Sequence, residues 1–137
     1  MKFLAATAVT VCALSAGVSA QAAGSAKVIK LVAVQQSQKD IPNGFVIKDN
    51  DFIAGKKVGH DTLTCKVASS QQKANCKVLF QLTGGTMKGT VAIVFSKSQG
   101  GGTITGGTGN YARAKGKLAF RNLNEKGTRT AITLTLT

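Results

Sequence analysis

A glycine-rich stretch toward the end of the chain limits the possible folds more than any other feature. Residues 101–109 read GGTITGGTG, with five glycines, and an alternating apolar segment follows them. Glycine tolerates positive φ and close backbone approach, so the stretch predicts tight turning that leads into a strand. Such tight turning before a strand indicates a closely wound, β-rich fold.

The first twenty residues have the features of a secretory signal peptide. Lys2 provides the positive start, the apolar core runs from Leu4 to Leu14, and small residues up to Ala20 form a cleavage site. We therefore expect residues 21–137 to form one exported domain, extracellular or periplasmic. The loss of Lys2 would lower the formal net charge from +13 to +12. A lipoprotein anchor at Cys12 is the alternative, but Val11 stands where a small residue is expected.

The positive charge is spread along the chain as single lysines and pairs, never as a long block. This spacing favours a solvated outer face that keeps the protein soluble. Binding of acidic glycans or envelope lipids through that face is the alternative. Specific nucleic-acid recognition is not expected, because few aromatic residues are left to form an exposed stacking row.

Apolar runs separated by turn chemistry predict eight strands. Eight strands with short connections favour an all-β fold, a single antiparallel barrel that leaves no exposed sheet edge. The expected strands are Lys27 to Gln35, Gly44 to Phe52, Val58 to Val67, Asn75 to Leu82, Met87 to Phe95, Gly102 to Thr105, Lys115 to Asn122 and Thr128 to Leu136.

Two cysteines, Cys65 and Cys76, remain after signal cleavage, and an even pair in an exported chain predicts a disulfide rather than free thiols. If they face each other across a hairpin, Leu63 meets Val78 and Asp61 meets Phe80 on one apolar face, which we assign to the barrel lumen.

The next hairpin extends this face. A two-residue turn at Gly84 and Gly85 would pair Leu82 with Met87 and Val78 with Val91. The lumen face then stays apolar over three strands.

Acidic residues interrupt the apolar lumen. Placing Phe45 and Ile47 inward also turns Asp49 and Asp51 inward, and a three-residue loop near Gly55 would set Asp51 beside Asp61. Clustered carboxyl groups in an apolar barrel raise one another's pKa, so one of them could serve as a general acid. In the alternative register these acids lie at the barrel mouth, solvated and paired with Lys48, Lys56 or Lys57.

Neither a metal nor a cofactor is expected. Asp49 and Asp51 resemble the start of a calcium loop, but Ile53 replaces an oxygen ligand and His60 stands where a bidentate glutamate belongs. His60 is the only histidine, and the predicted register points it outward. The GTGNYA stretch from Gly107 lacks the following helix that a dinucleotide site requires, so its glycines are interpreted as strand corners.

Two motifs resemble a known family. The GGTGNYARAKG segment from Gly106 to Gly116 is similar to the turn signature of the allene oxide cyclase and dirigent barrel superfamily, and KKVG at Lys56 to Gly59, followed by Cys65, resembles a strand of the cyclase branch. The resemblance covers about Ile29 to Leu136 and implies the family's eight-stranded barrel. It also implies a possible homotrimer, for which the Thr-rich outer face of residues 128–137 is the candidate.

The resemblance further implies lumen chemistry. Dirigent proteins are thought to use lumen aspartates as acids, which makes Asp49, Asp51 and Asp61 candidate catalytic residues. The first-strand glutamate of the cyclases has no counterpart between Leu31 and Val34, so their reaction itself is not implied.

We hypothesise that the lumen binds a small hydrophobic molecule and steers its cyclisation or coupling. The alternative is a non-enzymatic cationic protein that acts on acidic glycans or envelope lipids. The candidate ligand-binding residues are Phe45, Ile47, Leu63, Phe80, Val91 and Tyr111.

Overall fold

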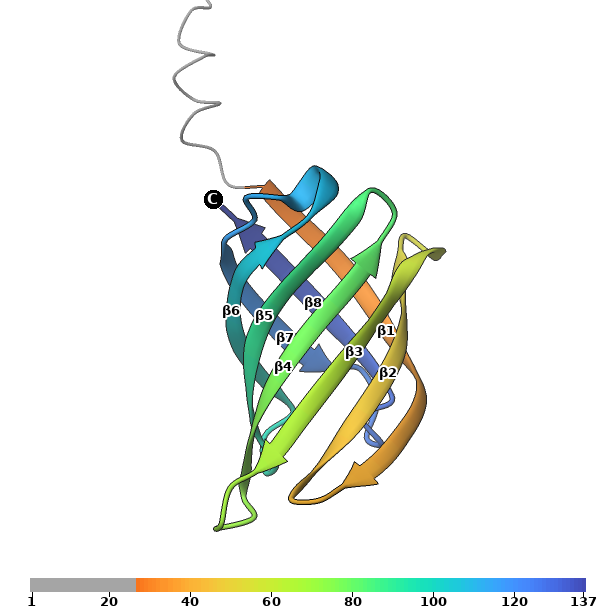
Figure 1. Ribbon diagram of the computed structural model, residues 1–137. Coiled ribbons are helices and arrows are strands. Elements are labelled where there is room, and N and C mark those ends of the chain that lie inside the picture. Colours follow the sequence, from red (N-terminus) through yellow and green to blue (C-terminus); the bar gives the residue numbers. More distant parts are fainter. Residues whose placement is uncertain (1–26) are drawn as a thin grey trace, which may run out of the picture.

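A computed structural model describes residues 27–137; the predicted signal peptide and its cleavage site lie outside this part of the chain. The described residues form eight strands and one 3-10 turn (Figure 1). The strands are β1 (Lys27–Ile41), β2 (Gly44–Ile53), β3 (Lys56–Val67), β4 (Lys73–Leu82), β5 (Gly85–Val94), β6 (Gln99–Gly107), β7 (Gly116–Asn122) and β8 (Arg129–Leu136), and the turn is η2 (Gly109–Tyr111).

Each strand pairs antiparallel with its neighbour in sequence, and β8 pairs back onto β1, so the sheet closes into one barrel. The predicted eight-stranded antiparallel barrel is confirmed. Figure 1 shows two unlike ends: η2 lies at the upper end, which we call the closed end. The loops that join β1 to β2, β3 to β4, β5 to β6 and β7 to β8 lie at the other end, which we call the open end.

The hairpin of β3 and β4 has the predicted register. Cys65 lies opposite Cys76, and the two form a disulfide with their Cα atoms 4.0 Å apart. Leu63 pairs with Val78 and Asp61 with Phe80, as expected from the cysteines. Both cysteines are buried, so the bridge lies on the lumen side.

The predicted register of the next hairpin is wrong by two residues. Phe80 pairs with Met87 and Cys76 with Val91, because the turn consists of Thr83 and Gly84 rather than of two glycines. Gly85 instead belongs to β5, where a Cβ would clash with the backbone oxygen of Thr108. This glycine is required by the close approach of the η2 segment. The lumen face is unchanged, since a shift of two residues preserves the side of the sheet.

Inward side chains fill the half of the barrel next to the closed end. The largest of these side chains are almost completely buried: Leu31, Phe80, Met87, Ile104 and Leu134. In the described part of the chain, no helix is long and apolar enough to cross a membrane.

Gly102 of β6 is expected to be intolerant of any side chain, because a Cβ there would clash with the backbone oxygen of Thr90 on β5. Gly102→Ala should therefore lower the free energy of unfolding by about 2 kcal/mol or more, as overpacked sites do. Gly106→Ala is the matched control, since its Cβ would meet only the flexible end of Lys88 at 3.4 Å. Urea unfolding of both variants measures the difference, and equal midpoints would contradict the predicted clash.

Candidate functional site

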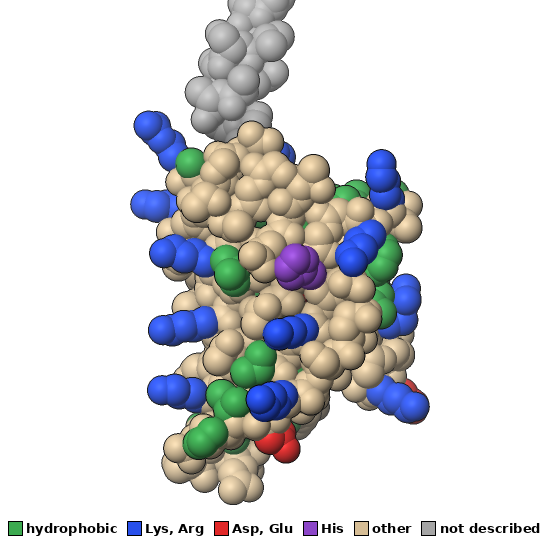
Figure 2. Space-filling model, turned by 45° about the vertical axis from the view of Figure 1, so that its right-hand side comes forward, with side chains coloured by type: hydrophobic (Ala, Val, Ile, Leu, Met, Phe, Trp, Pro, Cys, Tyr) green, Lys and Arg blue, Asp and Glu red, His purple; other side chains and the backbone are tan. Residues whose placement is uncertain are grey.

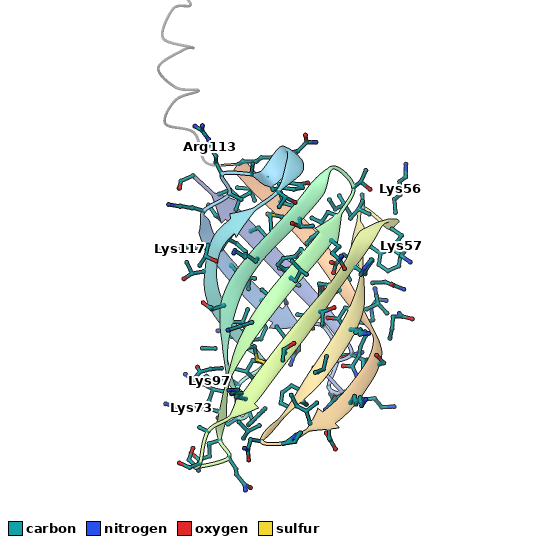
Figure 3. The ribbon with its side chains drawn as sticks, viewed as in Figure 1. Lys56, Lys57, Lys73, Lys97, Arg113 and Lys117 are labelled. Atoms are coloured by element: carbon teal, nitrogen blue, oxygen red, sulfur yellow. A yellow bond between two sulfur atoms is a disulfide. The ribbon has the colours of Figure 1, made fainter. Side chains whose placement is uncertain are left out.

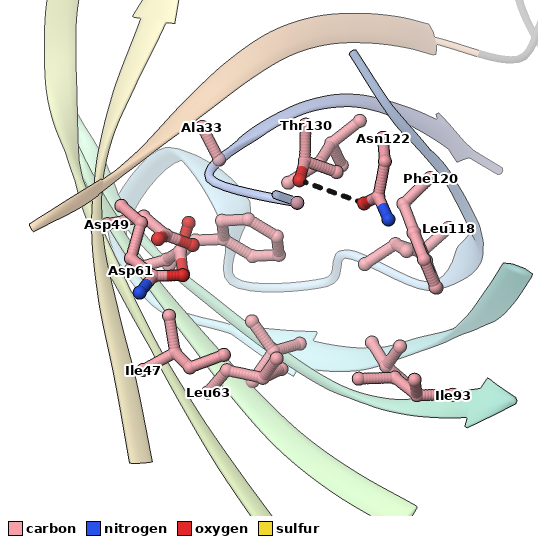
Figure 4. Close-up of a pocket in the computed structure, with 16 residues that line it drawn as sticks. Ala33, Ile47, Asp49, Asp61, Leu63, Ile93, Leu118, Phe120, Asn122 and Thr130 are labelled. Carbon is pink, nitrogen blue, oxygen red and sulfur yellow. Dashed lines mark hydrogen bonds between the residues drawn. The ribbon is translucent and has the colours of Figure 1, made fainter. Parts of the chain in front are cut away.

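A cavity of about 120 Å³ occupies the half of the lumen toward the open end. Figure 4 shows its wall, which is mostly apolar with a pair of carboxyl groups on one side. The lining residues are Ala33, Gln35, Ile47, Asp49, Asp61, Leu63, Val78, Phe80, Val91, Ile93, Leu118, Phe120, Asn122, Gly127, Thr130 and Ile132. An apolar cavity of roughly 150 Å³ holds one benzene ring in an engineered protein, so this volume is suited to a single small ring.

The carboxyl pair comes from two neighbouring strands. Asp49 of β2 lies directly opposite Asp61 of β3, whereas Asp51 lies opposite Gly59. The predicted pairing of Asp51 with Asp61 is therefore wrong by two residues along the strand. The loop has two residues, Ala54 and Gly55, and a bulge follows Asp51. The prediction that the three acids share one lumen wall is correct.

Asp51 lies deeper than the pair and does not line the cavity. Its pairing partners are Ala33 on β1 and Gly59 on β3. Both residues are small, so neither shields Asp51 from the lumen core. Its side chain is fully buried. Ionising a fully buried carboxyl group costs much free energy unless hydrogen-bond donors surround it.

Those donors are missing within residues 27–137. Both carboxyl oxygens of Asp51 and Oδ2 of Asp61 are buried without a hydrogen-bond partner as long as every carboxyl group is ionised. A proton on Asp61 removes much of this cost, because the protonated group can donate to an aspartate beside it. The geometry therefore favours a cluster that retains at least one proton.

The pKa values of all three carboxyl groups follow this environment. Burial raises the pKa of Asp61 to about 11, and hydrogen bonding with Asp51 and Asp49, together with their negative charges, contributes to the rise. Burial raises the pKa of Asp49 to about 6, although the hydrogen bond with Asp61 opposes the shift. Burial also raises the pKa of Asp51, with its own hydrogen bond to Asp61 opposing. Asp61 is thus the member that holds a proton at neutral pH.

A protonated carboxyl group that lines an apolar cavity can donate a hydrogen bond, or a proton, to a ligand oxygen. Asp61 is 2 % exposed and faces the cavity, so water competes little for that bond. Asp49 is half-buried beside it and can accept the proton in return. The pair can therefore supply a general acid, Asp61, and a general base, Asp49, to one bound molecule.

Polar side chains on the opposite wall were not predicted from the sequence. Asn122 of β7 and Thr130 of β8 lie across the cavity from the aspartates and are hydrogen bonded, with Thr130 Oγ1 donating to Asn122 Oδ1 at 3.4 Å (Figure 4). Gln35 lines the cavity beside Asp49, its pairing partner on β2. The alternation of inward and outward residues could have predicted the position of Asn122. It places Leu118, Phe120 and Asn122 on the same inward face of β7.

The predicted ligand-binding residues fall into two groups. Ile47, Leu63, Phe80 and Val91 line the cavity. Phe45 and Tyr111 pack against the core but are not among the lining residues. Phe45 contacts Phe95, with ring centroids 6.3 Å apart. Tyr111 is half-buried in η2, at the closed end of the barrel.

His60 is exposed and faces away from the lumen, where its Nε2 lies 2.8 Å from Oε1 of Gln81. The predicted outward position is correct. Among the residues that the structure describes, no group of three or more His, Cys, Asp or Glu side chains is arranged to hold a metal ion.

Comparison with known proteins supports the fold. No protein-family model matches the chain, and no curated protein matches its sequence. Among solved structures, the barrel is similar to a pyocyanin demethylase, with a TM-score of 0.68, 22 % identity, and coverage of 81 % of this chain and 100 % of that one. An exo-specific intermolecular Diels-Alderase has a TM-score of 0.64, 13 % identity, and coverage of 82 % and 98 %.

A pterocarpan synthase dirigent protein is also similar, with a TM-score of 0.55, 14 % identity, and coverage of 81 % of this chain and 82 % of that one. The protein thus has the barrel fold of the allene oxide cyclase and dirigent type, as the sequence motifs implied. At these identities the likeness defines the fold, and function must be argued from the site.

Proposed function

We propose that the barrel binds a small unsaturated molecule that carries a carbonyl or related oxygen, and that Asp61 protonates or polarises this oxygen to steer a cyclisation or coupling. The observation that carries the proposal is a buried carboxyl group, that of Asp61, which lines a mostly apolar cavity and has one oxygen without a hydrogen-bond partner. Apolar side chains would enclose the ring by shape. Asp61, the more basic of the pair, would recover the proton as the product forms and leaves, so no net proton is consumed.

The similar solved structures support this proposal by analogy. One is a Diels-Alderase and another a dirigent pterocarpan synthase. In this protein the same fold has an apolar lumen with an acid at its inner wall. Secretion, which the signal peptide predicts, would place this activity outside the cytoplasm.

Two probes of nearly equal shape test the acid. Acetophenone has a carbonyl oxygen where α-methylstyrene has a CH₂ group, so only acetophenone can accept a hydrogen bond from Asp61. We expect acetophenone to bind about tenfold more tightly at neutral pH, since a hydrogen bond contributes roughly 1–1.5 kcal/mol. Titration followed by NMR of the protein measures both affinities.

Asp61→Leu is the informative variant. It should abolish the preference for acetophenone while α-methylstyrene still binds, because the apolar wall is retained. Binding of neither probe to the wild type would mean that the cavity is not accessible. Equal binding of both would mean that Asp61 does not donate to the ligand, and either result overturns the proposed function.

A further inference from the structure

The outer wall of the barrel has an unusual distribution of charge. All Lys and Arg side chains of residues 27–137 are exposed. The chain has only five acids, and three of them, Asp49, Asp51 and Asp61, face the lumen. From β3 through β7, Asp61 is the only acid, so that stretch of wall has no negative side chain on its outside.

Figure 2 shows Lys and Arg side chains projecting over the visible wall, with acidic side chains only near its lower end. Lysines also reach both barrel ends: Lys56 and Lys57 lie at the closed end, and Lys73 and Lys97 at the open end (Figure 3). The outer surface therefore carries a positive charge that the acids of this chain do not balance.

Three of these lysines form a regular diagonal, which we call the lysine ladder: Lys66 on β3, Lys77 on β4 and Lys88 on β5. Lys77 pairs with Thr64 and with Thr90, so Lys66 and Lys88 are each displaced from it by one strand and two residues, in opposite directions. Strand spacing and rise per residue then separate successive Cα atoms by about 8 Å.

Surface hollows follow the ladder. One is lined by Lys66, Lys77 and the backbone of Gly101 and Gly102, and the next by Lys77, Lys88 and Leu79. The two hollows share Thr64, Lys77 and Thr90, so they are adjacent and lie on either side of this row; we call the two together the groove. Hydrogen-bonding side chains accompany the lysines along this groove: Thr62, Thr64, Asn75, Thr90, Thr103 and Thr105.

We propose that this groove binds a linear acidic polysaccharide, with the ladder contacting successive sulfate or carboxylate groups and the threonines and Asn75 contacting sugar hydroxyls. Regularly spaced ammonium groups complement a polymer with regularly spaced negative charges. A lipid surface fits less well, because the ladder lies along a curved wall with only one exposed large apolar side chain, Leu79, beside it. The proposal does not depend on the function of the cavity.

The experiment compares two triple variants that lose the same charge. Lys66→Gln, Lys77→Gln and Lys88→Gln remove the ladder, while Lys30→Gln, Lys56→Gln and Lys115→Gln remove exposed lysines elsewhere. Binding of the full chain to dextran sulfate is measured in about 150 mM salt, where long-range attraction is screened beyond roughly 8 Å. We expect the ladder variant to lose at least tenfold in affinity and the control variant less than threefold.

Three results would overturn the proposal. Equal losses in the two variants would mean that net charge alone drives binding. Equal binding of neutral dextran would remove the role of the acidic groups. Ladder-dependent binding to vesicles containing phosphatidylglycerol, without binding to dextran sulfate, would assign the surface to lipids.

Discussion

The protein is expected to become less stable as the pH rises from about 5 to 7, the reverse of ordinary acid denaturation. In the unfolded chain Asp61 ionises near the ordinary aspartate pKa of 3.8, whereas burial raises the pKa in the folded barrel to about 11. Over this interval the folded state keeps a proton that the unfolded state has released. Stability then falls by about 1.4 kcal/mol per pH unit from this residue alone.

The sign follows from the raised pKa. Stabilisation from a carboxyl group that stays protonated on folding is fully present below its unfolded pKa and is lost progressively above it. Asp49 acts in the same direction between the ordinary aspartate pKa and its raised pKa of about 6, by a smaller amount because it is only half-buried. Urea unfolding at several pH values, followed by circular dichroism, measures the slope.

Asp61→Asn should flatten this dependence, since the amide keeps the shape of the side chain and a donor but holds no titrating proton. Asp40→Asn, which removes an exposed acid on β1, controls for the loss of one negative charge. Wild-type stability that is constant or rises over this pH range would contradict a proton held in the lumen.

The aspartate cluster therefore destabilises the barrel at neutral pH. Apolar residues at these three positions would avoid the buried oxygens that lack donors. Functional sites often contain residues that reduce stability, whereas the rest of a sequence agrees with the packing of its fold. The rest of the lumen shows the expected consistency, since its inward positions are otherwise almost all apolar.

The sequence was sufficient to predict which side chains face the lumen, but it gave the correct register for only one of the three hairpins tested. Alternation with a period of two turns Leu63, Val78 and Val91 inward, and the disulfide fixes one hairpin. Both register errors shift a strand by two residues, which leaves every side chain on the same face. Hydrophobic alternation cannot detect such a shift, so only turn geometry decides between the alternatives.

The geometry of the two mispredicted turns depends on features that the local sequence does not show. One turn depends on a contact with a segment distant in the sequence, and the other on a bulge in the neighbouring strand. The glycine pair predicts Gly85 to be a turn residue, but it is needed in β5 because η2 packs against it. Ala54 adopts φ of 50° and Gly55 φ of 82°, which makes a two-residue turn where three residues were expected. The resulting change places Asp49, and not Asp51, opposite Asp61.

The empty half of the lumen was also beyond prediction from the pattern. Inward-facing positions specify a lumen, but whether it is filled depends on the summed side-chain volumes at each level of the barrel. Met87 and Ile104 are almost fully buried in the filled core, while Ala33, Val78 and Val91 are among the smaller side chains that line the cavity. Cavity volume is therefore a property of the closed ring and not of any single strand.

Filling this space should abolish ligand binding without harming the fold. Val91 lines the cavity, so Val91→Phe would place a ring in the volume that a ligand needs. We expect at least a hundredfold loss of affinity for acetophenone and α-methylstyrene alike. Because the new side chain enters an existing void, stability should stay within about 1 kcal/mol of the wild type or increase.

The adjacent residue provides the matched control for that loss. Ala92 is exposed on the opposite face of the same strand, so Ala92→Phe adds the same ring outside the lumen and should leave probe binding unchanged. Calorimetric titration of both variants measures probe binding, and thermal unfolding measures their stability, so a loss of binding can be distinguished from a loss of folding. Undiminished binding by a folded Val91→Phe protein would place the ligand elsewhere, and the aspartate pair would then have no role in recognition.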